Sequence, residues 1–400
     1  MNFSKDVAVI GGCGHVGLPL SLVLASSGRR TLVYDVDAPK VEAVRSGRMP
    51  FAEEGGEEAL TAVLRNGLLE VTDRPDLLAS CEFLIMVIGT PVDDYLNPSF
   101  SGLVKCLETC RPHLRDGQVL VLRSTVFPGI SSHVQAWLSR AGLSVSVVFF
   151  PERVVQGRSL AEIRSLPQIV SAFSPEALER AKALFAPFTS EFVEMAPMEA
   201  ELCKLMTNAW RYLQFATVNQ FYMIATENGL DFDRVLHGCR HHYPRMASMP
   251  GPGLAAGPCL FKDTMQLAAF SHNTFVLGHA AMLVNEGLPA HLIALAKRKA
   301  DLSSRVAGVL GMAFKSESDD PRASLSYKLR RLLLLEAREV LATDPYVPDP
   351  GLLPLDEVLA RSDVLFIGAP HARYRDLALR KDQLLVDVWN HVAVESAWRA

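Results

Sequence analysis

The stretch Val7-Ala-Val-Ile10-Gly-Gly12-Cys-Gly14-His-Val-Gly17 decides how this chain of 400 residues begins to fold. A short β-branched run leads directly into glycines spaced Gly-x-Gly-x-x-Gly, and residues 18–25 then predict a helix. Glycines at this spacing permit a tight turn and let a pyrophosphate approach the backbone, with the helix N-terminus facing the phosphates. The stretch therefore predicts a dinucleotide-binding unit.

The residues that follow indicate which dinucleotide is bound. Thr31-Leu-Val-Tyr34 predicts a second strand, which closes on Asp35, eighteen residues after Gly17. A carboxylate there can accept a hydrogen bond from the ribose 2′-hydroxyl and would repel a 2′-phosphate, so NAD is expected rather than NADP. The residues of this unit expected to bind the cofactor are Gly12, Gly14, His15, Val16, Gly17 and Asp35.

Three further buried strands are predicted, at residues 83–88, 119–122 and 144–150. They end close to Thr90, Thr125 and Glu152. In open α/β sheets ligands bind beyond the carboxyl ends of the strands, so cofactor and substrate are expected near these three residues. The alternative for each is an ordinary turn residue at the end of a strand, and Thr90 fits that alternative best.

A long helix is predicted over residues 199–228, which contain neither glycine nor proline and repeat apolar residues at helical spacing. Lys204 and Asn208 are four residues apart and therefore lie on one face of this helix. By themselves, a charged and an amide side chain on a helix face predict solvated surface.

The stretch Gly251-Pro-Gly-Leu-Ala-Ala-Gly-Pro-Cys259-Leu-Phe-Lys262-Asp263 places one cysteine in a Gly/Pro loop. Gly and Pro hold the backbone in conformations that other residues resist, so this loop can present the thiol at a fixed position. A neighbouring ammonium such as Lys262 favours thiolate over thiol, as a nucleophile requires. A small buried hydrophobic residue is the alternative for Cys259, and it is the usual role of a cysteine without a disulfide.

From Leu302 onward the sequence returns to α/β alternation, which predicts a second, smaller nucleotide-binding-type domain. The fold class is therefore α/β, with two Rossmann-like domains joined by a long central helix. We expect an NAD-binding domain at residues 1–195, a central helical domain with the cysteine loop at 196–298, and a C-terminal domain at 299–400.

The composition excludes several classes of function. A formal charge of −4 without a long basic run gives no electrostatic case for binding nucleic acid or a membrane surface. The seven cysteines are scattered without a CxxC pair, a pattern typical of a reduced, cytoplasmic protein rather than a disulfide framework or zinc site. His241 and His242 have no third ligand at regular spacing, so no metal is expected.

Taken in order, these motifs resemble the UDP-glucose/GDP-mannose dehydrogenase family over roughly residues 7 to 390. Thr125 and Glu152 match its Ser-Thr and Pro-Glu motifs, and the cysteine loop matches its glycine-rich loop. Lys204 and Asn208, with Glu201, match its Glu-x-x-Lys-x-x-x-Asn pattern. The expected substrate-binding residues are Glu152, Arg153, Lys204, Asn208, Arg245, Gly253, Phe314, Lys315 and Arg322, the last three from the family's Phe-Lys and Asp-Asp-x-Arg-x-Ser motifs.

The resemblance implies an NAD-dependent, four-electron oxidation of the C6 hydroxyl of a UDP-sugar to a carboxylate, a role in polysaccharide biosynthesis, and a homodimer that uses the long helix. Lys204 and Asn208 would stabilise the oxyanion of the first oxidation, and Cys259 would form a thiohemiacetal and then a thioester. Thr125 would place the hydrolytic water. Either Asp263 or Glu152 would act as the base, and the sequence leaves that choice open.

The sequence also departs from the family pattern. Ala256-Gly257 stands where a Gly-Gly pair is usual, and Pro258 precedes the cysteine. Pro151-Glu152-Arg153 resembles the branch that oxidises UDP-N-acetylhexosamines, and a strand-end arginine could donate to an acetamido carbonyl. We therefore expect UDP-N-acetylglucosamine or UDP-N-acetylmannosamine, although Lys262-Asp263 looks more like the UDP-glucose branch. Two different functions compete with this one: a two-electron hydroxyacid-type dehydrogenase, which needs no cysteine, and a non-catalytic nucleotide-sugar-binding protein.

Overall fold

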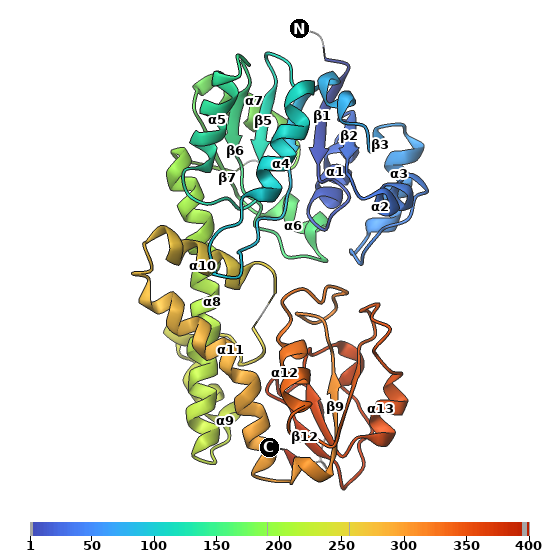
Figure 1. Cartoon of the computed structure of the whole chain (residues 1–400), viewed down its shortest axis with the longest axis vertical. Helices are drawn as coiled ribbons and strands as arrows, with labels where there is room; N and C mark the ends of the chain where they lie inside the picture. Colours follow the sequence, from blue (N-terminus) through green and yellow to red (C-terminus); the bar gives the residue numbers. More distant parts are fainter. Residues whose placement is uncertain (1–2, 190, 256, 394–397, 400) are drawn as a thin grey trace. The chain divides into compact units, whose positions relative to one another are not determined.

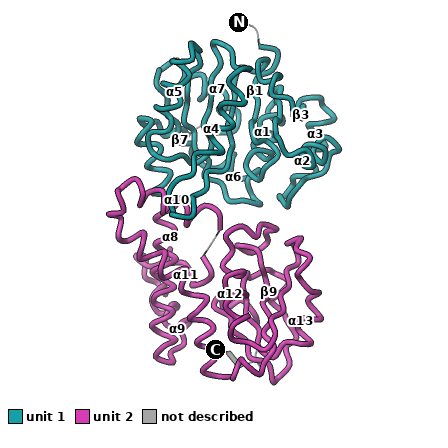
Figure 2. Tube along the Cα trace, in the orientation of Figure 1, with its two compact units in different colours: residues 1–207 teal, residues 208–400 magenta. Residues whose placement is uncertain are grey.

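The structure is a computed structural model that describes residues 3–189, 191–255, 257–393 and 398–399 (Figure 1). Residue Ala256, one of the departures from the family loop, lies outside the described residues. The chain divides into two compact units, residues 1–207 and residues 208–400, which are called unit 1 and unit 2 below (Figure 2).

Unit 1 is built on a sheet with the strand order β3-β2-β1-β4-β5-β6-β7-β8. Neighbouring strands are parallel except for β6 and β7, which are antiparallel. The strands are β1 (Lys5–Ile10), β2 (Thr31–Tyr34), β3 (Leu69–Thr72), β4 (Cys81–Met86), β5 (Val119–Leu122), β6 (Ser146–Phe149), β7 (Gln168–Ala172) and β8 (Phe192–Glu194). Because β1 pairs with both β2 and β4, the strand order reverses direction at β1, where such sheets bind ligands.

Helices cover both faces of this sheet. Along β1, Val7 and Val9 pack on one face with residues of α1 and α7, whereas Ala8 and Ile10 pack on the other with residues of α4 and α5. Strand residues buried on both faces explain the nearly continuous apolar runs in the sequence. The helices of unit 1 are α1 (Gly17–Ser26), α2 (Ala38–Arg45), α3 (Gly56–Arg65), α4 (Ser101–Cys110), α5 (Ile130–Arg140), α6 (Ser159–Ser165) and α7 (Pro175–Phe185).

The long helix predicted from the sequence is confirmed as α8 (Pro197–Glu227). The boundary between the two units falls within it, after Thr207. Residues at the start of α8, such as Ala200, pack in a core of unit 1, and Val218 and Tyr222 further along it pack in a core of unit 2.

Unit 2 contains a parallel sheet with the strand order β10-β9-β11-β12-β13. Its strands are β9 (Val306–Leu310), β10 (Glu339–Thr343), β11 (Val364–Ile367), β12 (Leu384–Val386) and β13 (Trp398–Arg399), and its helices are α9 (Phe232–Arg240), α10 (Leu260–Phe270), α11 (Val276–Lys297), α12 (Leu325–Leu333) and α13 (Leu355–Arg361). The predicted α/β fold with two parallel-sheet regions and a long central helix is confirmed.

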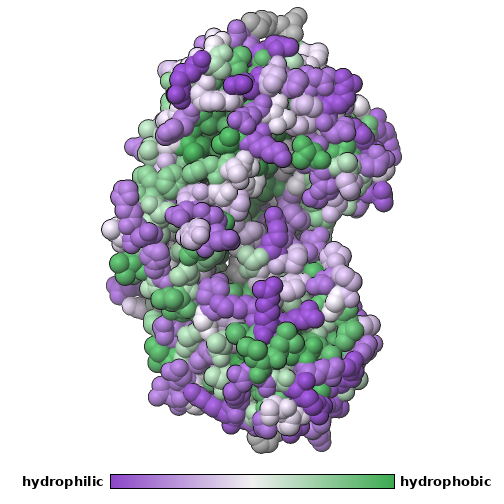
Figure 3. Space-filling model, viewed as in Figure 1, coloured by the Kyte–Doolittle hydropathy of each residue, from purple (hydrophilic) through white to green (hydrophobic). Residues whose placement is uncertain are grey.

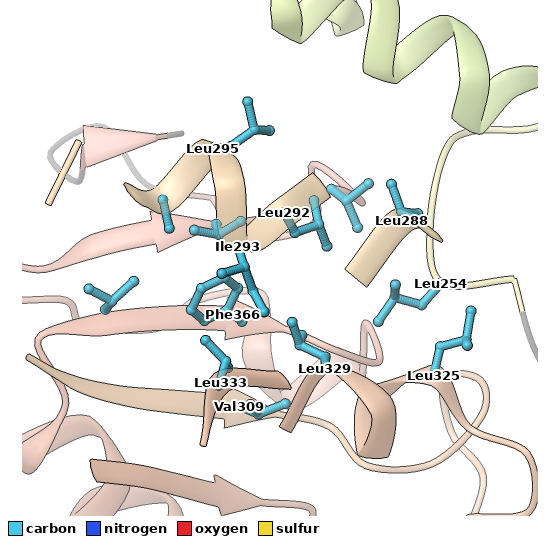
Figure 4. Close-up of a cluster of buried hydrophobic side chains, with 14 of the residues drawn as sticks. Leu254, Leu288, Leu292, Ile293, Leu295, Val309, Leu325, Leu329, Leu333 and Phe366 are labelled. Carbon is cyan, nitrogen blue, oxygen red and sulfur yellow. The ribbon is translucent and has the colours of Figure 1, made fainter. Parts of the chain in front are cut away.

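The largest core of unit 2 joins the helices to this sheet. Leu292 of α11 packs with Leu329 of α12 and with Phe366 of β11 (Figure 4). Leu254, from the loop that carries Cys259, is part of the same core and is only 2% exposed. The cysteine loop is therefore anchored in the interior of unit 2 before it reaches the thiol.

Candidate active site

The glycine turn after β1 is shaped by close backbone contacts. A Cβ added to Gly12 would lie 2.6 Å from the Val9 carbonyl oxygen, and one added to Gly17 would lie 2.5 Å from the Gly11 carbonyl oxygen. Gly14 differs, because its added Cβ would come no closer than 3.6 Å to a neighbouring atom. Close packing therefore leaves no room for a side chain at Gly12 or Gly17. At Gly14 there is room, and the absence of a side chain lets a pyrophosphate approach the backbone of the turn.

Asp35 lies at the end of β2 and faces this turn. Its Oδ2 accepts a hydrogen bond from the Cys13 N–H at 2.9 Å, and its Oδ1 accepts one from the Asp37 N–H at 3.1 Å. His15, in the turn itself, lies 4.2 Å from Phe51 between ring centroids. Backbone N–H groups therefore orient the half-buried carboxylate of Asp35. The glycine turn fits the pyrophosphate of NAD, and the carboxylate fits the hydroxyl groups of its adenosine ribose.

The loops that follow β4 and β5 are joined by side chains. Thr90 Oγ1 donates to the Thr125 carbonyl at 2.6 Å, and Ser124 Oγ accepts from the Ile88 N–H at 2.6 Å. The structure therefore brings Thr90 and Thr125 together at the carboxyl ends of adjacent strands, where the sequence predicted a site.

Glu152 follows β6 and forms a buried ion pair with Arg123. The Arg123 side chain is fully buried, and its Nη2 lies 2.5 Å from Glu152 Oε2. The guanidinium also lies 5.1 Å from the centroid of the Phe150 ring. The other carboxylate oxygen of Glu152 accepts the N–H groups of Arg153 at 2.7 Å and Val154 at 3.1 Å. Both carboxylate oxygens of Glu152 are therefore held in place by hydrogen bonds.

Sequence reasoning missed Arg123, which directly follows a predicted strand. The only indication in the sequence was that an arginine directly follows an apolar run. An arginine buried at such a position needs a carboxylate partner, which could have been sought among the nearby acidic residues. Arg153, which we expected to bind substrate, is half-buried and donates to the Pro167 carbonyl.

The polar residues of α8 are buried rather than solvated. Glu201 is 1% exposed and accepts the N–H groups of Gly129 at 2.6 Å and Ser131 at 2.8 Å, so it caps the N-terminus of α5. Lys204 is 7% exposed and Asn208 5% exposed. The sequence taken without the family pattern predicted a solvated face, and the structure buries it.

Cys259 directly precedes α10 and is exposed. Its carbonyl accepts the N–H of Asp263 at 2.9 Å, which is the first turn of the helix. The N-terminus of a helix carries a partial positive charge and favours thiolate over thiol. The thiol therefore lies at a position suited to a nucleophile, and the buried-hydrophobe alternative is excluded.

Asp263, one turn into α10, is fully buried and has two partners. Its Oδ2 accepts from Asn208 Nδ2 at 2.5 Å, and its Oδ1 lies 2.5 Å from Lys262 Nζ. The ammonium and the amide balance a carboxylate that water cannot reach. The structure thus brings Asn208 and Asp263 together although they are far apart in the sequence.

The expected substrate residues of the C-terminal region adjoin the cysteine loop. An added Cβ on Gly257 would lie 2.4 Å from the Phe314 ring, and the Gly257 N–H donates to the Ala323 carbonyl at 3.3 Å. Arg322 is paired with Asp320, with Nη2 and Oδ2 2.6 Å apart. The Asp320 carboxylate raises the pKa of Arg322 above its usual value, and negative charge at Cys259 adds to this effect.

Two more of the expected substrate residues lie beside aromatic rings. Lys315 Nζ lies 6.0 Å from the centroid of the Phe314 ring. Arg245 is exposed, its guanidinium lies 5.9 Å from the centroid of the Tyr243 ring, and its Nη1 donates to the Tyr243 hydroxyl at 3.2 Å. Each of these cationic side chains therefore lies beside an aromatic ring, Lys315 beside Phe314 and Arg245 beside Tyr243.

Comparison with known proteins accounts for this arrangement of motifs. Residues 5–189 match the NAD binding domain of the UDP-glucose/GDP-mannose dehydrogenase family, residues 198–286 its central domain, and residues 308–393 its UDP binding domain. The chain belongs to the UDP-glucose/GDP-mannose dehydrogenase family. It is therefore an NAD-dependent nucleotide-sugar dehydrogenase.

Individual members of the UDP-glucose/GDP-mannose dehydrogenase family resemble the whole chain. UDP-N-acetyl-D-mannosamine dehydrogenase from Pyrococcus horikoshii is 29% identical over 384 residues, covering 93% of this chain and 90% of the relative. The solved structure of that enzyme has a TM-score of 0.90 at 27% identity and covers 98% of each chain. A UDP-glucose dehydrogenase from Pyrobaculum islandicum has a TM-score of 0.89 at 26% identity, over 98% of this chain and 95% of its own.

Among the described residues, no helix combines the length and the apolar content needed to cross a bilayer.

Proposed function

We propose that this enzyme oxidises the C6 hydroxyl of a UDP-N-acetylhexosamine to the uronic acid in two successive oxidations. The observation that carries the proposal is Cys259, exposed at the N-terminus of α10 and one turn from the buried Asp263. A two-electron dehydrogenase has no use for a presented thiol, and neither has a protein that only binds a nucleotide sugar.

In the first oxidation, the hydroxyl proton is lost and negative charge develops on the C6 oxygen. We assign the stabilisation of that charge to the Lys204 ammonium and the Asn208 amide. One N–H of Asn208 is held by Asp263, and a primary amide has a second N–H that can serve the substrate oxygen. When bound, NAD accepts the hydride at each oxidation, so one sugar yields two NADH.

In the second oxidation, the Cys259 thiolate adds to the C6 aldehyde and forms a C–S bond. The resulting thiohemiacetal loses a hydride and a proton to become a thioester. Water then adds to the thioester carbonyl, the C–S bond breaks, and the products are the carboxylate and the regenerated thiol. Each sugar thus consumes one water in addition to the two hydride transfers.

For the hydrolytic base we favour Glu152 over Asp263. The Asp263 side chain is fully buried and holds both Asn208 and Lys262, which suits a positioning role. The Glu152 side chain keeps 10% of its surface exposed, so water can reach it. We assign the placement of that water to Thr125, which is also half-buried.

Two observations support an acetamido sugar. The relative from Pyrococcus horikoshii is named for UDP-N-acetyl-D-mannosamine, and this chain aligns with nearly all of it. The Arg153 guanidinium uses one N–H on Pro167 and has further N–H groups that can donate to an acetamido carbonyl. UDP-glucose is the alternative, because a UDP-glucose dehydrogenase is almost as similar in structure.

Turnover with UDP-N-acetylmannosamine, UDP-N-acetylglucosamine and UDP-glucose tests this assignment directly. We expect the highest kcat/KM for one of the acetamido sugars, since a site built around a hydrogen bond rejects an analogue that lacks it. A higher kcat/KM for UDP-glucose than for both acetamido sugars would overturn the choice.

We also propose that the enzyme acts as a homodimer through α8. Met206, Trp210, Phe221 and Ile224 are exposed on α8, and their spacing puts them on one face of a helix with about 3.6 residues per turn. Val276, Leu277 and Leu283 of α11 are exposed as well. Figure 3 shows apolar side chains on the surface around α10 and α11. Exposed apolar surface of this kind is typical of an interface.

The remaining assignments concern organisation and setting. We propose functional domains at residues 1–195, 196–298 and 299–400, supported by the three family matches. A thiol nucleophile requires a reducing compartment, which favours the cytoplasm. A sugar uronic acid attached to UDP is an activated building block, which favours a role in polysaccharide biosynthesis.

A further inference from the structure

Asn219 of α8 binds the backbone of the cysteine loop through both ends of its amide. Its Nδ2 donates to the Gly253 carbonyl at 3.0 Å, and its Oδ1 accepts the Gly253 N–H at 2.9 Å. Asn219 is 0% exposed. The amide thus satisfies both backbone groups of Gly253, as the backbone of a neighbouring strand would, and it fixes the position of this loop residue.

The same amide is held from the side of α11. Asn219 Nδ2 also donates to Asn285 Oδ1 at 2.9 Å, and Asn285 Nδ2 donates to the Tyr212 carbonyl at 3.3 Å. Asn285 is 0% exposed as well. Buried amides are costly unless they are hydrogen-bonded, so this pair is held in one arrangement.

Gly253 cannot shift toward its other neighbour. An added Cβ would lie 2.1 Å from the Trp389 ring, so the residue is enclosed between that ring and Asn219. The next residue, Leu254, is buried in the core of unit 2 (Figure 4). Further along, Gly257 packs against Phe314, and the loop then delivers Cys259 to the N-terminus of α10.

We propose that Asn219 is a positioning residue that holds the cysteine loop so that Cys259 stays at the N-terminus of α10. This inference rests on the proposed function of Cys259 as the nucleophile of the second oxidation. Asn219 acts through its two hydrogen bonds to Gly253, and neither of these bonds involves Asn285. Without the two hydrogen bonds between Asn219 and Gly253, the loop can move. A displacement of about 1 Å at a reacting group costs roughly 10²-fold in rate.

The test compares Asn219→Ala with the matched variant Asn285→Ala, which removes the same chemical group from the same buried pair but does not touch the loop. The first measurement needs no substrate. The rate at which iodoacetamide alkylates Cys259 is followed against pH, with the modified peptide identified by mass spectrometry. The midpoint of this profile reports how strongly the thiolate is stabilised. We expect the midpoint to rise in Asn219→Ala and to stay at the wild-type value in Asn285→Ala.

The second measurement uses UDP-N-acetylmannosamine and NAD. We expect Asn219→Ala to lose about 10²-fold in kcat with a much smaller change in KM, and to yield fewer than two NADH per sugar, with the aldehyde trapped by semicarbazide. Asn285→Ala should keep the wild-type yield at a lower melting temperature. If Asn219→Ala does not fold, Asn219→Ser is measured in the same way.

Three outcomes decide between the explanations. A wild-type alkylation midpoint and wild-type kcat in a folded Asn219 variant would overturn the inference. Equal shifts in the Asn219 and Asn285 variants would also overturn it, because they would reflect general packing. If the wild-type enzyme oxidises none of the sugars, the proposed function fails, and the alkylation profiles still decide the role of Asn219.

Discussion

Asn208 of α8 donates its side-chain amide to Asp263 of α10, with 2.5 Å between Nδ2 and Oδ2, and both residues are buried. The contact ties the helix that carries Lys204 to the helix that begins after Cys259. It also supplies one of the two groups that balance the Asp263 carboxylate, the second being the Lys262 ammonium.

Asn208→Ala should therefore lower both stability and activity. It leaves a buried carboxylate with one partner fewer, which costs about 1.5–3 kcal/mol for a hydrogen bond to a charged group. It also removes an oxyanion donor, which costs roughly 10²-fold in kcat. Thermal melting and steady-state kinetics measure the two effects. Arg211→Ala, an exposed change on the same helix away from its apolar face, is the control and should alter neither. Unchanged melting in Asn208→Ala would contradict the role of the pair.

Asp35 should determine the choice between NAD and NADP. Asp35→Ser removes the carboxylate that would repel a 2′-phosphate, so the ratio of kcat/KM for NAD to that for NADP should fall toward one. Asp37→Asn removes a charge two residues away and should leave the ratio near the wild-type value. A wild-type preference for NADP would show that Asp35 does not face the ribose.

Asp344 should make part of the stability depend on pH below neutrality. Burial acts to raise its pKa, but hydrogen bonds from His371 and from the N–H groups of Tyr346 and Ala313 outweigh burial and lower the pKa to about 2. Because the folded pKa lies below the unfolded value of about 3.9, the contribution is complete above about pH 5 and is lost as the pH falls toward 2.

The comparison of wild type with Asp344→Asn tests this dependence. At pH 6 the variant should be less stable by on the order of 2 kcal/mol, and the gap should narrow as the pH falls from 4 to 2. Urea unfolding at several pH values measures it. A gap that stays constant over this range would show that the ionisation of Asp344 does not contribute.

Trp210 tests the proposed dimer. Its side chain is 63% exposed in the single chain and lies on the apolar face of α8. Trp210→Glu places a charge in the centre of that face and should convert a dimer into a monomer, as measured by light scattering during gel filtration. Arg211→Glu introduces the same charge at the next residue, which is also exposed but lies about 100° around the helix from Trp210, and it should leave the dimer intact. A monomeric wild type would exclude the proposed interface.

Local patterns account for what the sequence predicted correctly. The tight turn after β1 and the position of Asp35 at the end of β2 could be predicted because they depend on residues close together in the chain. The long helix was identified from its spacing of apolar residues. The burial of Lys204 and Asn208 needed the family pattern, because the partner of Asn208 is Asp263, 55 residues away.

The residues that sequence reasoning missed have distant partners. Arg123 is bound by Glu152, and Asn219 is bound by Gly253 and Asn285. In the sequence each is one of several neighbouring polar residues, Arg123 beside Ser124 and Asn219 beside Gln220, so neither stands out. The tertiary structure shows that each is hydrogen-bonded to a residue that we expected in the site, Arg123 to Glu152 and Asn219 to Gly253.

The NADH yield per sugar tests the central claim most directly. With limiting UDP-N-acetylmannosamine and excess NAD, the wild-type enzyme should form two NADH per sugar and release the uronic acid. Cys259→Ser should still bind NAD and the sugar nucleotide, but steady-state acid formation should fall by several orders of magnitude, since the second oxidation has lost its nucleophile. A yield of one NADH from the wild type, or near wild-type turnover by Cys259→Ser, would contradict the thioester route.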